Sequence, residues 1–228
     1  MIKPNVLVAG FSRCGSTYLY QLLRQHPDIH IPREKEINYL HKMPLFLSHP
    51  HLMNLKFFFP KSNYFRKFRN DKKINIDFSV MTAYDLESAE RVKRELGDIK
   101  IIFITRNKED HSKSVRKTME NHGEKMYIDA SYYSNFERFI EPYRENFKNV
   151  IVLKMEELSK NPEKILKKIF KFLEVPFLKI NYNVYKNTSS TYFSDKHKER
   201  FSYFIFRFKR NVLKFFSYII TPLARRAG

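Results

Sequence analysis

The part of the sequence that most constrains the fold lies near its amino-terminal end. A short apolar run at residues 5–9 ends at Gly10, and Gly15 closes a Gly-x-x-x-x-Gly loop that leads through Ser16 and Thr17 into a helical pattern. A strand, a loop and a helix N-terminus in this order present backbone N–H groups and the positive end of a helix dipole to an anion. We therefore expect a phosphate or sulfate group to bind there.

One position separates this loop from the template of P-loop nucleotide-binding proteins. The template is Gly-x-x-x-x-Gly-Lys-Ser/Thr, and its lysine reaches the phosphates. Here Ser16 stands at the position of that lysine, and the cation of the loop is Arg13, inside it. This substitution argues against an ordinary ATPase or GTPase and indicates an anionic nucleotide that is held without the usual lysine.

The loop also contains Cys14, the single cysteine of the chain. One cysteine excludes an internal disulfide and fits a reducing compartment. A helix N-terminus lowers the pKa of a nearby thiol, so a nucleophilic cysteine is one interpretation. The alternative is a small loop residue that supplies its backbone N–H to the anion.

Strand and helix patterns alternate along the rest of the chain. Short apolar runs predict buried parallel strands at residues 5–9, 74–78, 99–105 and 150–154. Helical patterns occupy residues 17–25, 85–96, 108–120, 132–146 and 162–173. Asp85 and Asn161 are expected to be N-caps of two of these helices. The alternation predicts an α/β fold like that of P-loop NTPases, a single domain with a parallel sheet and helices on both faces.

Two segments depart from this alternation. Residues 41–70 contain an aromatic run and a basic run, which predict short helices and loops that form a lid or a substrate wall. Residues 196–228 form a basic, aromatic extension after a domain at residues 1–195, and we expect an amphipathic C-terminal helix there. Its apolar face, flanked by cations, fits the surface of an acidic membrane. The alternative is a helix that packs on the sheet with its charges in solvent.

The formal net charge is +19, from 43 lysine and arginine residues against 24 aspartate and glutamate residues. Such a charge attracts nucleotides, nucleic acids, acidic glycans and acidic membranes without selecting among them. No apolar run reaches the length of about 18 uncharged residues that a membrane span needs, and no signal peptide precedes the first strand. We therefore expect a cytoplasmic protein, with peripheral contact at the cytoplasmic face of the membrane as a further possibility.

A second candidate anion site follows the strand predicted at residues 99–105. Arg106 comes directly after it, and Ser114 lies one to two turns into the next helix. An arginine offers a planar fork to a phosphate, and a serine adds a hydroxyl. Together with a phosphate loop on another strand of the same sheet, this pair predicts a ligand with anionic groups at two separated places.

Three motifs together resemble those of sulfotransferases that use 3′-phosphoadenosine 5′-phosphosulfate (PAPS). Residues 13–17 resemble the 5′-phosphosulfate loop of that family, and residues 106–114 resemble its 3′-phosphate motif. Lys35-Glu36, followed by Asn38-Tyr39-Leu40, is similar to the Lys-Glu-x-x-aromatic segment of the carbohydrate and tyrosylprotein branches. The motifs occur in the order of the family and lie within residues 5–120.

Departures from the pattern indicate which branch the chain resembles. Cytosolic small-molecule sulfotransferases carry lysine where this chain has Arg13, usually a tryptophan where it has Tyr18, and a later histidine as the base. The combination of Arg13 and Glu36 resembles instead the heparan-type, tyrosylprotein and bacterial branches.

The resemblance implies a role for each matching residue. Glu36 is expected to be the catalytic base, although it can also simply pair with a nearby cation, and Glu34 competes with it for the role. Arg13 is expected to act in catalysis and in donor binding. The other implied residues hold PAPS and its product, adenosine 3′,5′-bisphosphate (PAP): Cys14, Gly15, Ser16, Thr17, Arg106 and Ser114. Lys186 and Asn187 are the candidates for the loop that closes over the nucleotide, or else form a polar turn. No metal is expected.

The acceptor is expected to be a hydroxyl group of a carbohydrate or glycolipid, and a protein tyrosine stays open. The residues predicted to face it are Lys35, Tyr39, Asp77, Ser79 and Tyr84. Asp77 also stands where a P-loop ATPase has its acidic metal-binding residue, but the template lysine that would accompany it is missing.

Two other classes of function compete with this interpretation. One is a P-loop nucleotide kinase or NTPase, against which the missing lysine counts. The other is a non-enzymatic basic module that binds nucleic acid or anionic lipid. It accounts for the charge but not for the ordered pattern of Arg13, Glu36, Arg106 and Ser114, so nucleic acid is not expected as a partner.

Overall fold

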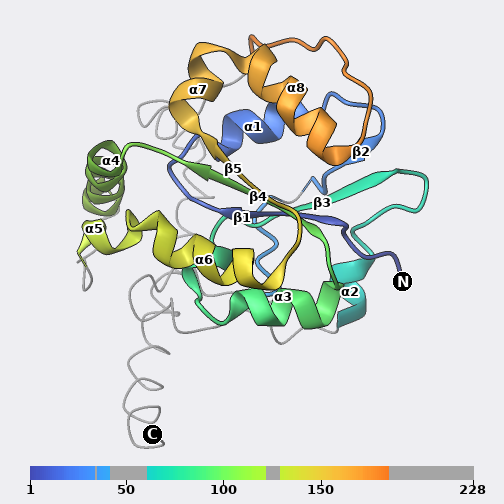
Figure 1. Cartoon of the computed structure of the whole chain (residues 1–228), viewed down its shortest axis with the longest axis horizontal. Coiled ribbons are helices and arrows are strands. Elements are labelled where there is room, and N and C mark those ends of the chain that lie inside the picture. The colour runs from blue at the N-terminus through green and yellow to red at the C-terminus, as the bar shows by residue number, and fades with distance from the viewer. Residues whose placement is uncertain (34, 42–60, 122–128, 185–228) are drawn as a thin grey trace, which may run out of the picture.

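A computed structural model describes residues 1–33, 35–41, 61–121 and 129–184 of the chain (Figure 1). Several predictions lie outside the described residues. They concern Glu34, most of the predicted lid at residues 41–70, Lys186, Asn187 and the extension at residues 196–228.

Five strands form one parallel sheet: β1 (Val6–Gly10), β2 (Ile29–His30), β3 (Ile74–Phe78), β4 (Lys100–Thr105) and β5 (Val150–Lys154). Their order is β2-β3-β1-β4-β5, and every neighbouring pair is parallel. The four predicted strands are confirmed, each to within one residue at its ends. All five residues of β1 and of β3 are buried, because helices cover both faces of the sheet. This burial explains why β1 reads as a continuous apolar run, whereas β3 also carries the buried polar residues Asn75 and Asp77.

Helices cover the sheet on both sides, which confirms the predicted α/β fold (Figure 1). One face carries α1 (Ser16–Leu23), α7 (Met155–Lys160) and α8 (Pro162–Leu173). The opposite face carries α2 (Lys61–Phe65), α3 (Ser88–Leu96) and α6 (Phe136–Asn146). Beyond the carboxyl ends of the strands lie α4 (Lys108–Asn121) and α5 (Ala130–Tyr133), and a short 3₁₀ helix, η4 (Thr82–Tyr84), follows β3.

The helix predictions need three corrections. The pattern at residues 132–146 is two helices, α5 and α6, and the Asp129 side chain caps α5 by accepting from the Ser131 N–H at 2.7 Å. The helix predicted from Asp85 begins at Ser88. Asp85 Oδ1 accepts a hydrogen bond from the Glu87 N–H at 3.2 Å just before this helix, and Asp85 Oδ2 binds the Arg91 guanidinium at 2.8 Å. Neither β2 nor α7 was predicted, since two and six residues are too short to show a period.

The predicted cap at Asn161 is confirmed. Its Oδ1 accepts a hydrogen bond from the Lys164 N–H at 3.1 Å, and Pro162 occupies the first position of α8. A side-chain acceptor followed by proline is the combination that starts a helix with its free N–H groups satisfied. The helix therefore begins where the sequence places it.

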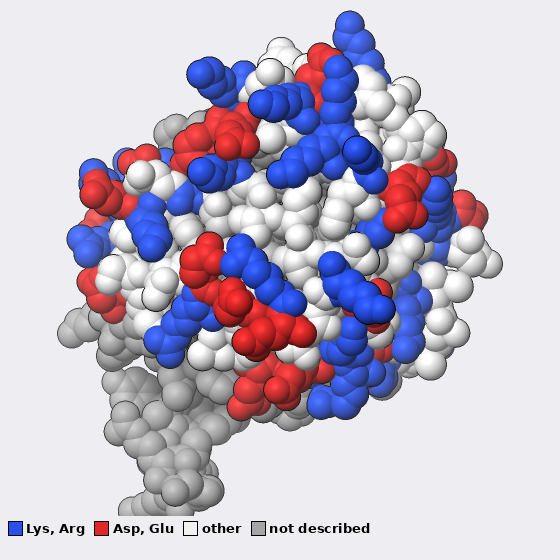
Figure 2. Space-filling model, viewed as in Figure 1, with Lys and Arg blue, Asp and Glu red and all other residues white. Residues whose placement is uncertain are grey.

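The positive charge is not gathered into one uninterrupted surface on the face seen in Figure 2. Acidic side chains lie between the lysines and arginines there. Among the described residues, no helix is both long and apolar enough to span a bilayer.

Candidate active site

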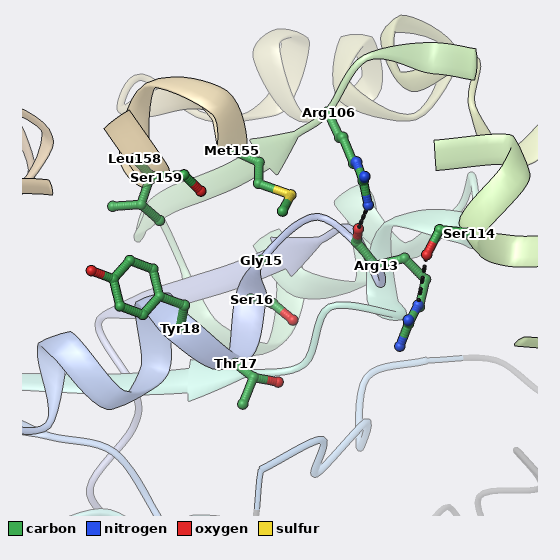
Figure 3. Close-up of a pocket in the computed structure, with 10 residues that line it drawn as sticks. All are labelled: Arg13, Gly15, Ser16, Thr17, Tyr18, Arg106, Ser114, Met155, Leu158 and Ser159. Carbon is green, nitrogen blue, oxygen red and sulfur yellow. Dashed lines mark hydrogen bonds between the residues drawn. The ribbon is translucent and has the colours of Figure 1, made fainter. Parts of the chain in front are cut away.

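A pocket opens at the carboxyl ends of the central strands β1 and β4 (Figure 3). The segments that leave these two neighbouring strands lead to opposite edges of the sheet, which is the place where ligands bind in open α/β folds. Its lining includes six residues predicted from the sequence: Arg13, Gly15, Ser16, Thr17, Arg106 and Ser114. Four more line it that were not predicted as site residues: Tyr18, Met155, Leu158 and Ser159.

Gly15 sets the path of the loop into α1. Its φ of 79° lies in the left-handed region that favours glycine. A Cβ atom at this position would also approach Met155 Cγ to 3.1 Å, tighter than ordinary van der Waals contact. Conformation and space both require glycine here, so that the loop can turn and direct the first N–H groups of α1 toward the pocket.

Cys14 is buried in the core, with none of its surface exposed. Burial raises the pKa of its thiol well above the usual value, an effect that outweighs the nearby Arg106 and Arg13. The expectation that the helix N-terminus lowers this pKa is therefore wrong, because the side chain points into the core. A neutral, buried thiol argues against the interpretation of Cys14 as a nucleophile. The remaining interpretation is that Cys14 supplies its backbone N–H to the anion.

Arg13, Arg106 and Ser114 lie together at one end of the pocket (Figure 3), although their motifs assigned Arg13 to the 5′-phosphosulfate and the other two to the 3′-phosphate. Arg13 Nε donates a hydrogen bond to Ser114 Oγ at 3.1 Å, and Arg106 Nη1 donates to the Arg13 carbonyl oxygen at 3.5 Å. Two guanidinium groups and a hydroxyl from three separate segments therefore lie at one end of the pocket. This donor set suits a phosphate.

His111 of α4 fastens that helix to the loop. Its Nε2 lies 3.0 Å from the Ser12 carbonyl oxygen and its Nδ1 lies 2.8 Å from Ser134 Oγ. Burial lowers the pKa of His111 to about 4, so the ring is neutral at physiological pH. Because a carbonyl only accepts, Nε2 carries the proton and Nδ1 accepts from the Ser134 hydroxyl. The ring joins the loop, α4 and the residue after α5, and no pattern in the sequence indicates these contacts.

Lys35 lies against the start of α1. Its Nζ donates hydrogen bonds to Ser16 Oγ and to Thr17 Oγ1, each at 3.1 Å. We predicted that this side chain faces the acceptor, and the structure instead brings it to the hydroxyl groups of the phosphate loop. No sequence spacing indicates the contact, since the lysine comes from the segment after β2.

Glu36, the next residue, is held by the backbone after β3. Its Oε2 accepts from the Val80 N–H at 3.0 Å, and its Oε1 lies 3.6 Å from Lys35 Nζ. The side chain keeps 30% of its surface exposed. Partial burial raises the pKa of this carboxyl to about 7, although Lys35 opposes the change. The group is thus accessible, and it exchanges a proton near neutral pH.

Two of the residues predicted to face the acceptor are buried behind Glu36, and this is a correction. Ser79 Oγ donates to Asp77 Oδ1 at 2.5 Å, and Tyr64 OH donates to Asp77 Oδ2 at 2.8 Å. Ser79 Oγ also accepts from the Asn38 N–H at 2.9 Å. With only 1% of each exposed, Asp77 and Ser79 hold the segment that carries Glu36.

The two tyrosines predicted to face the acceptor differ in how far they are buried. Tyr84 is buried in the core, where its ring contacts Phe11 and Phe139 at centroid distances of 5.3 Å, so its predicted place at the acceptor is also corrected. Tyr39 is partly exposed and stacks on Tyr64 at 4.6 Å, three residues after Glu36. Within the described ranges, no three His, Cys, Asp or Glu side chains gather as a metal site would require.

Comparisons with known proteins agree with this architecture. Residues 3–211 match the family described as Sulfotransferase domain. A sulfotransferase from Alicyclobacillus acidocaldarius superposes with a TM-score of 0.68 at 22% identity, covering 83% of this chain and 86% of that one. The sulfotransferase domain of the Synechococcus olefin synthase gives 0.55 at 20% identity, covering 81% and 78%.

A mouse sulfotransferase solved in complex with PAP gives a TM-score of 0.50 at 18% identity, covering 77% of this chain and 60% of that one. No curated protein sequence matches the chain significantly. The solved structures share the fold, and the family match extends over most of the chain. On these grounds the chain belongs to the sulfotransferase domain family.

Proposed function

We propose that this sulfotransferase takes the sulfuryl group from PAPS and passes it to a hydroxyl group of a carbohydrate or glycolipid, with Glu36 as the base. The observation that carries the proposal is the pocket, in which the loop after β1 faces Arg106 and Ser114 after β4. Two separate sets of anion-binding groups in one pocket suit a nucleotide that carries phosphates on both its 3′ and 5′ positions.

The residues present fit this nucleotide. The N–H groups at the start of α1, with Ser16 and Thr17, would hold the 5′-phosphosulfate, while Arg106 and Ser114 would hold the 3′-phosphate. Tyr18 and Met155 would supply aromatic and apolar surface for the adenine of the nucleotide. The Tyr18 hydroxyl is held in place because it donates to the Tyr182 carbonyl oxygen at 3.1 Å. Lys186 and Asn187 remain candidates for closing over the nucleotide.

PAPS supplies the sulfuryl group and a phosphate leaving group, so the protein needs mainly to align the reactants and balance charge. Glu36 would accept the proton of the attacking hydroxyl. A carboxyl with a pKa of about 7 suits this task, because it is a better proton acceptor than an ordinary carboxylate and is still largely ionised just above neutral pH.

The proposed acceptor class is supported by the segment that carries the base. Tyr39, three residues after Glu36, is a partly exposed aromatic residue, and an aromatic ring stacks on a sugar ring. The Lys-Glu-x-x-aromatic segment at residues 35–39 also resembles that of the carbohydrate branch. As part of the same proposal, the enzyme is cytoplasmic, and the basic extension at residues 196–228 contacts the acidic membrane surface where a glycolipid is found.

Thermal stabilisation by PAP tests the nucleotide assignment. We expect a large rise in the melting temperature with PAP that does not depend on magnesium, and little change with AMP or with ATP. Stabilisation by magnesium-ATP alone would support a kinase-like site instead. With PAP binding established, radiolabelled PAPS and a panel of glycans, glycolipids and tyrosine peptides would identify the acceptor class.

A further inference from the structure

An ammonium group lies at the phosphate loop although the loop lacks its template lysine. Ser16 stands at the template position, and the atoms that receive hydrogen bonds from Lys35 Nζ are Ser16 Oγ and Thr17 Oγ1, each 3.1 Å away. In the P-loop template, a lysine at the position of Ser16 reaches the phosphates held by the loop. A lysine from another segment therefore brings its charge to the hydroxyls at the template lysine position and at the residue after it.

The end of β3 holds Lys35 in this position. The N–H of the next residue, Glu36, donates to the Phe78 carbonyl oxygen at 2.9 Å, which ties the segment to the strand. The Lys35 ammonium also lies over the Phe78 ring, 5.4 Å from its centroid. Backbone and side chain are thus both fixed by β3, so the position of Nζ does not depend on the loop alone.

The groups around the ammonium act on its pKa in opposite directions. Burial lowers the pKa of Lys35, and the Glu36 carboxylate at 3.6 Å opposes part of this change. The two remaining neighbours are hydroxyls, which accept hydrogen bonds from the ammonium and add no negative charge to that of Glu36. The charge of the ammonium is available to an anion in the loop.

Arg13 does not occupy this place. Its Nε donates to Ser114 Oγ, and in Figure 3 its side chain runs toward Ser114 of α4, whereas Ser16 and Thr17 lie on the α1 side of the pocket. The two cations therefore lie in different places. Lys35 donates to the hydroxyls at the start of α1, and Arg13 lies with Arg106 at the other end of the pocket.

We propose that Lys35 supplies, from outside the loop, the missing P-loop cation, and that it is a catalytic residue which binds the 5′-phosphate and neutralises it as the sulfuryl group leaves. This inference rests on the proposed function. In the transfer, a bond forms between the acceptor oxygen and sulfur, and the bond from sulfur to the 5′-phosphate oxygen breaks. The electron pair stays on that phosphate oxygen, which receives a hydrogen bond from Lys35. The acceptor proton goes to Glu36, and Lys35 keeps its own.

Nucleotide binding separates this role from contact with the acceptor. In Lys35→Met we expect PAP to bind about 10- to 100-fold more weakly, the range for a lost charge-assisted hydrogen bond, while adenosine 3′-monophosphate binds as to the wild type. Arg106→Ala is the matched control at the other end of the pocket. It should weaken PAP and adenosine 3′-monophosphate and spare adenosine 5′-monophosphate.

Turnover gives a second readout. Lys35→Met should lower kcat by about 100-fold or more with little change in the KM of the acceptor, which is the size of effect seen when one charge-stabilising donor is removed. The slow hydrolysis of PAPS without acceptor should fall as well, since the same bond breaks. Lys35→Arg should recover part of both rates. Lys35→Cys treated with 2-bromoethylamine should recover more, because it restores an amine of similar length and Cys14 is buried.

The outcomes are distinct. Loss of PAP affinity with retained affinity for adenosine 3′-monophosphate, together with recovery by the restored amine, supports the proposal. Unchanged PAP affinity with a raised acceptor KM would return Lys35 to the acceptor and overturn it. A wild-type protein that binds no PAP would refute the proposed function itself, before any variant is compared.

Discussion

The two halves of the active site are built in different ways. The donor half, around Gly15 and Arg106, lies at the central strands β1 and β4, and its loop and its arginine each follow a strand directly. The half that carries Glu36 is a segment after the two-residue strand β2, held in place by the residues that follow β3. A phosphate is bound by local backbone geometry, which a short motif encodes. A catalytic base must instead be oriented toward the acceptor hydroxyl, and its orientation depends on residues distant in the sequence.

The largest effect is expected at the base. Glu36→Gln removes the proton acceptor and keeps the shape, so kcat should fall about 10²- to 10⁴-fold, the range for general base catalysis, while stabilisation by PAP persists. The measurement is steady-state turnover together with thermal shift. Glu90→Gln, on the exposed side of α3, is the control and should be as active as the wild type. Turnover near that of the wild type in Glu36→Gln would disprove the base assignment.

The second-largest effect is expected in the donor half, when Gly15 of the phosphate loop is replaced. Gly15→Ala places a Cβ at a φ of 79° and near Met155, and we expect a loss of about 1–2 kcal/mol in the free energy of unfolding together with the loss of PAP binding. Gly97→Ala separates the two effects, because Gly97 has a φ of 85° and no atom within 4 Å of the added Cβ. It should destabilise the fold at least as much, because its ψ of −156° lies in a region that is essentially restricted to glycine, and it should bind PAP normally. Normal PAP binding by Gly15→Ala would contradict the role of the loop.

The pH dependence of turnover should report the raised pKa of Glu36. The carboxyl must be ionised to accept a proton, so with a pKa of about 7 the rate should rise about tenfold from pH 6 to pH 8. Stability changes in the opposite direction. A carboxyl whose pKa is raised on folding keeps its proton longer when folded. The free energy of unfolding should therefore decrease as the pH rises from 4.5, the ordinary pKa of a glutamate side chain, to about 7.

Both slopes are measurable, by initial rates and by denaturant unfolding across this range. Glu36→Gln should lack this contribution to the stability slope. A rate that is constant from pH 6 to pH 8 would show that another group limits the reaction or that the carboxyl is not the base.

The smallest effect on function is expected for the residues that hold the segment of Glu36. Ser79→Ala removes the acceptor of the Asn38 N–H and one donor to Asp77, both in buried surroundings. We expect a loss of about 1–3 kcal/mol in stability from the unsatisfied groups, and a drop in kcat much smaller than that of Glu36→Gln, with PAP binding intact. An unchanged kcat in Ser79→Ala would show that Glu36 is aimed by Val80 alone.

The difference between the halves also explains what the sequence allowed us to predict. Strands β3 and β5 were predicted with their observed bounds because β-branched apolar residues recur through each of them, while β2 and α7 are too short to show a period. Arg13, Arg106 and Ser114 were predicted because each belongs to a motif with fixed spacing. Met155 belongs to no such motif and reaches the pocket only through α7, the helix missed.

In the half that carries Glu36, the sequence indicated the residues but not their positions. Its residue types were predicted, but Asp77 and Ser79 proved to be supports and Lys35 proved to contact the loop. These assignments depend on which side of a segment faces the core and on contacts between β2, β3 and α1. One sequence read in order does not contain that information, because tertiary packing decides which of several neighbouring polar residues is exposed.

The neutral histidine at the loop has a consequence for how such a site can be altered. His111 binds the Ser12 carbonyl without adding charge to the proposed anion site, since its pKa of about 4 leaves the ring neutral at physiological pH. The shape of the anion site and its electrical potential are therefore set by different residues. Substitutions of Arg13 or Arg106 can therefore adapt the pocket to another anionic donor, while His111 continues to hold the loop in position.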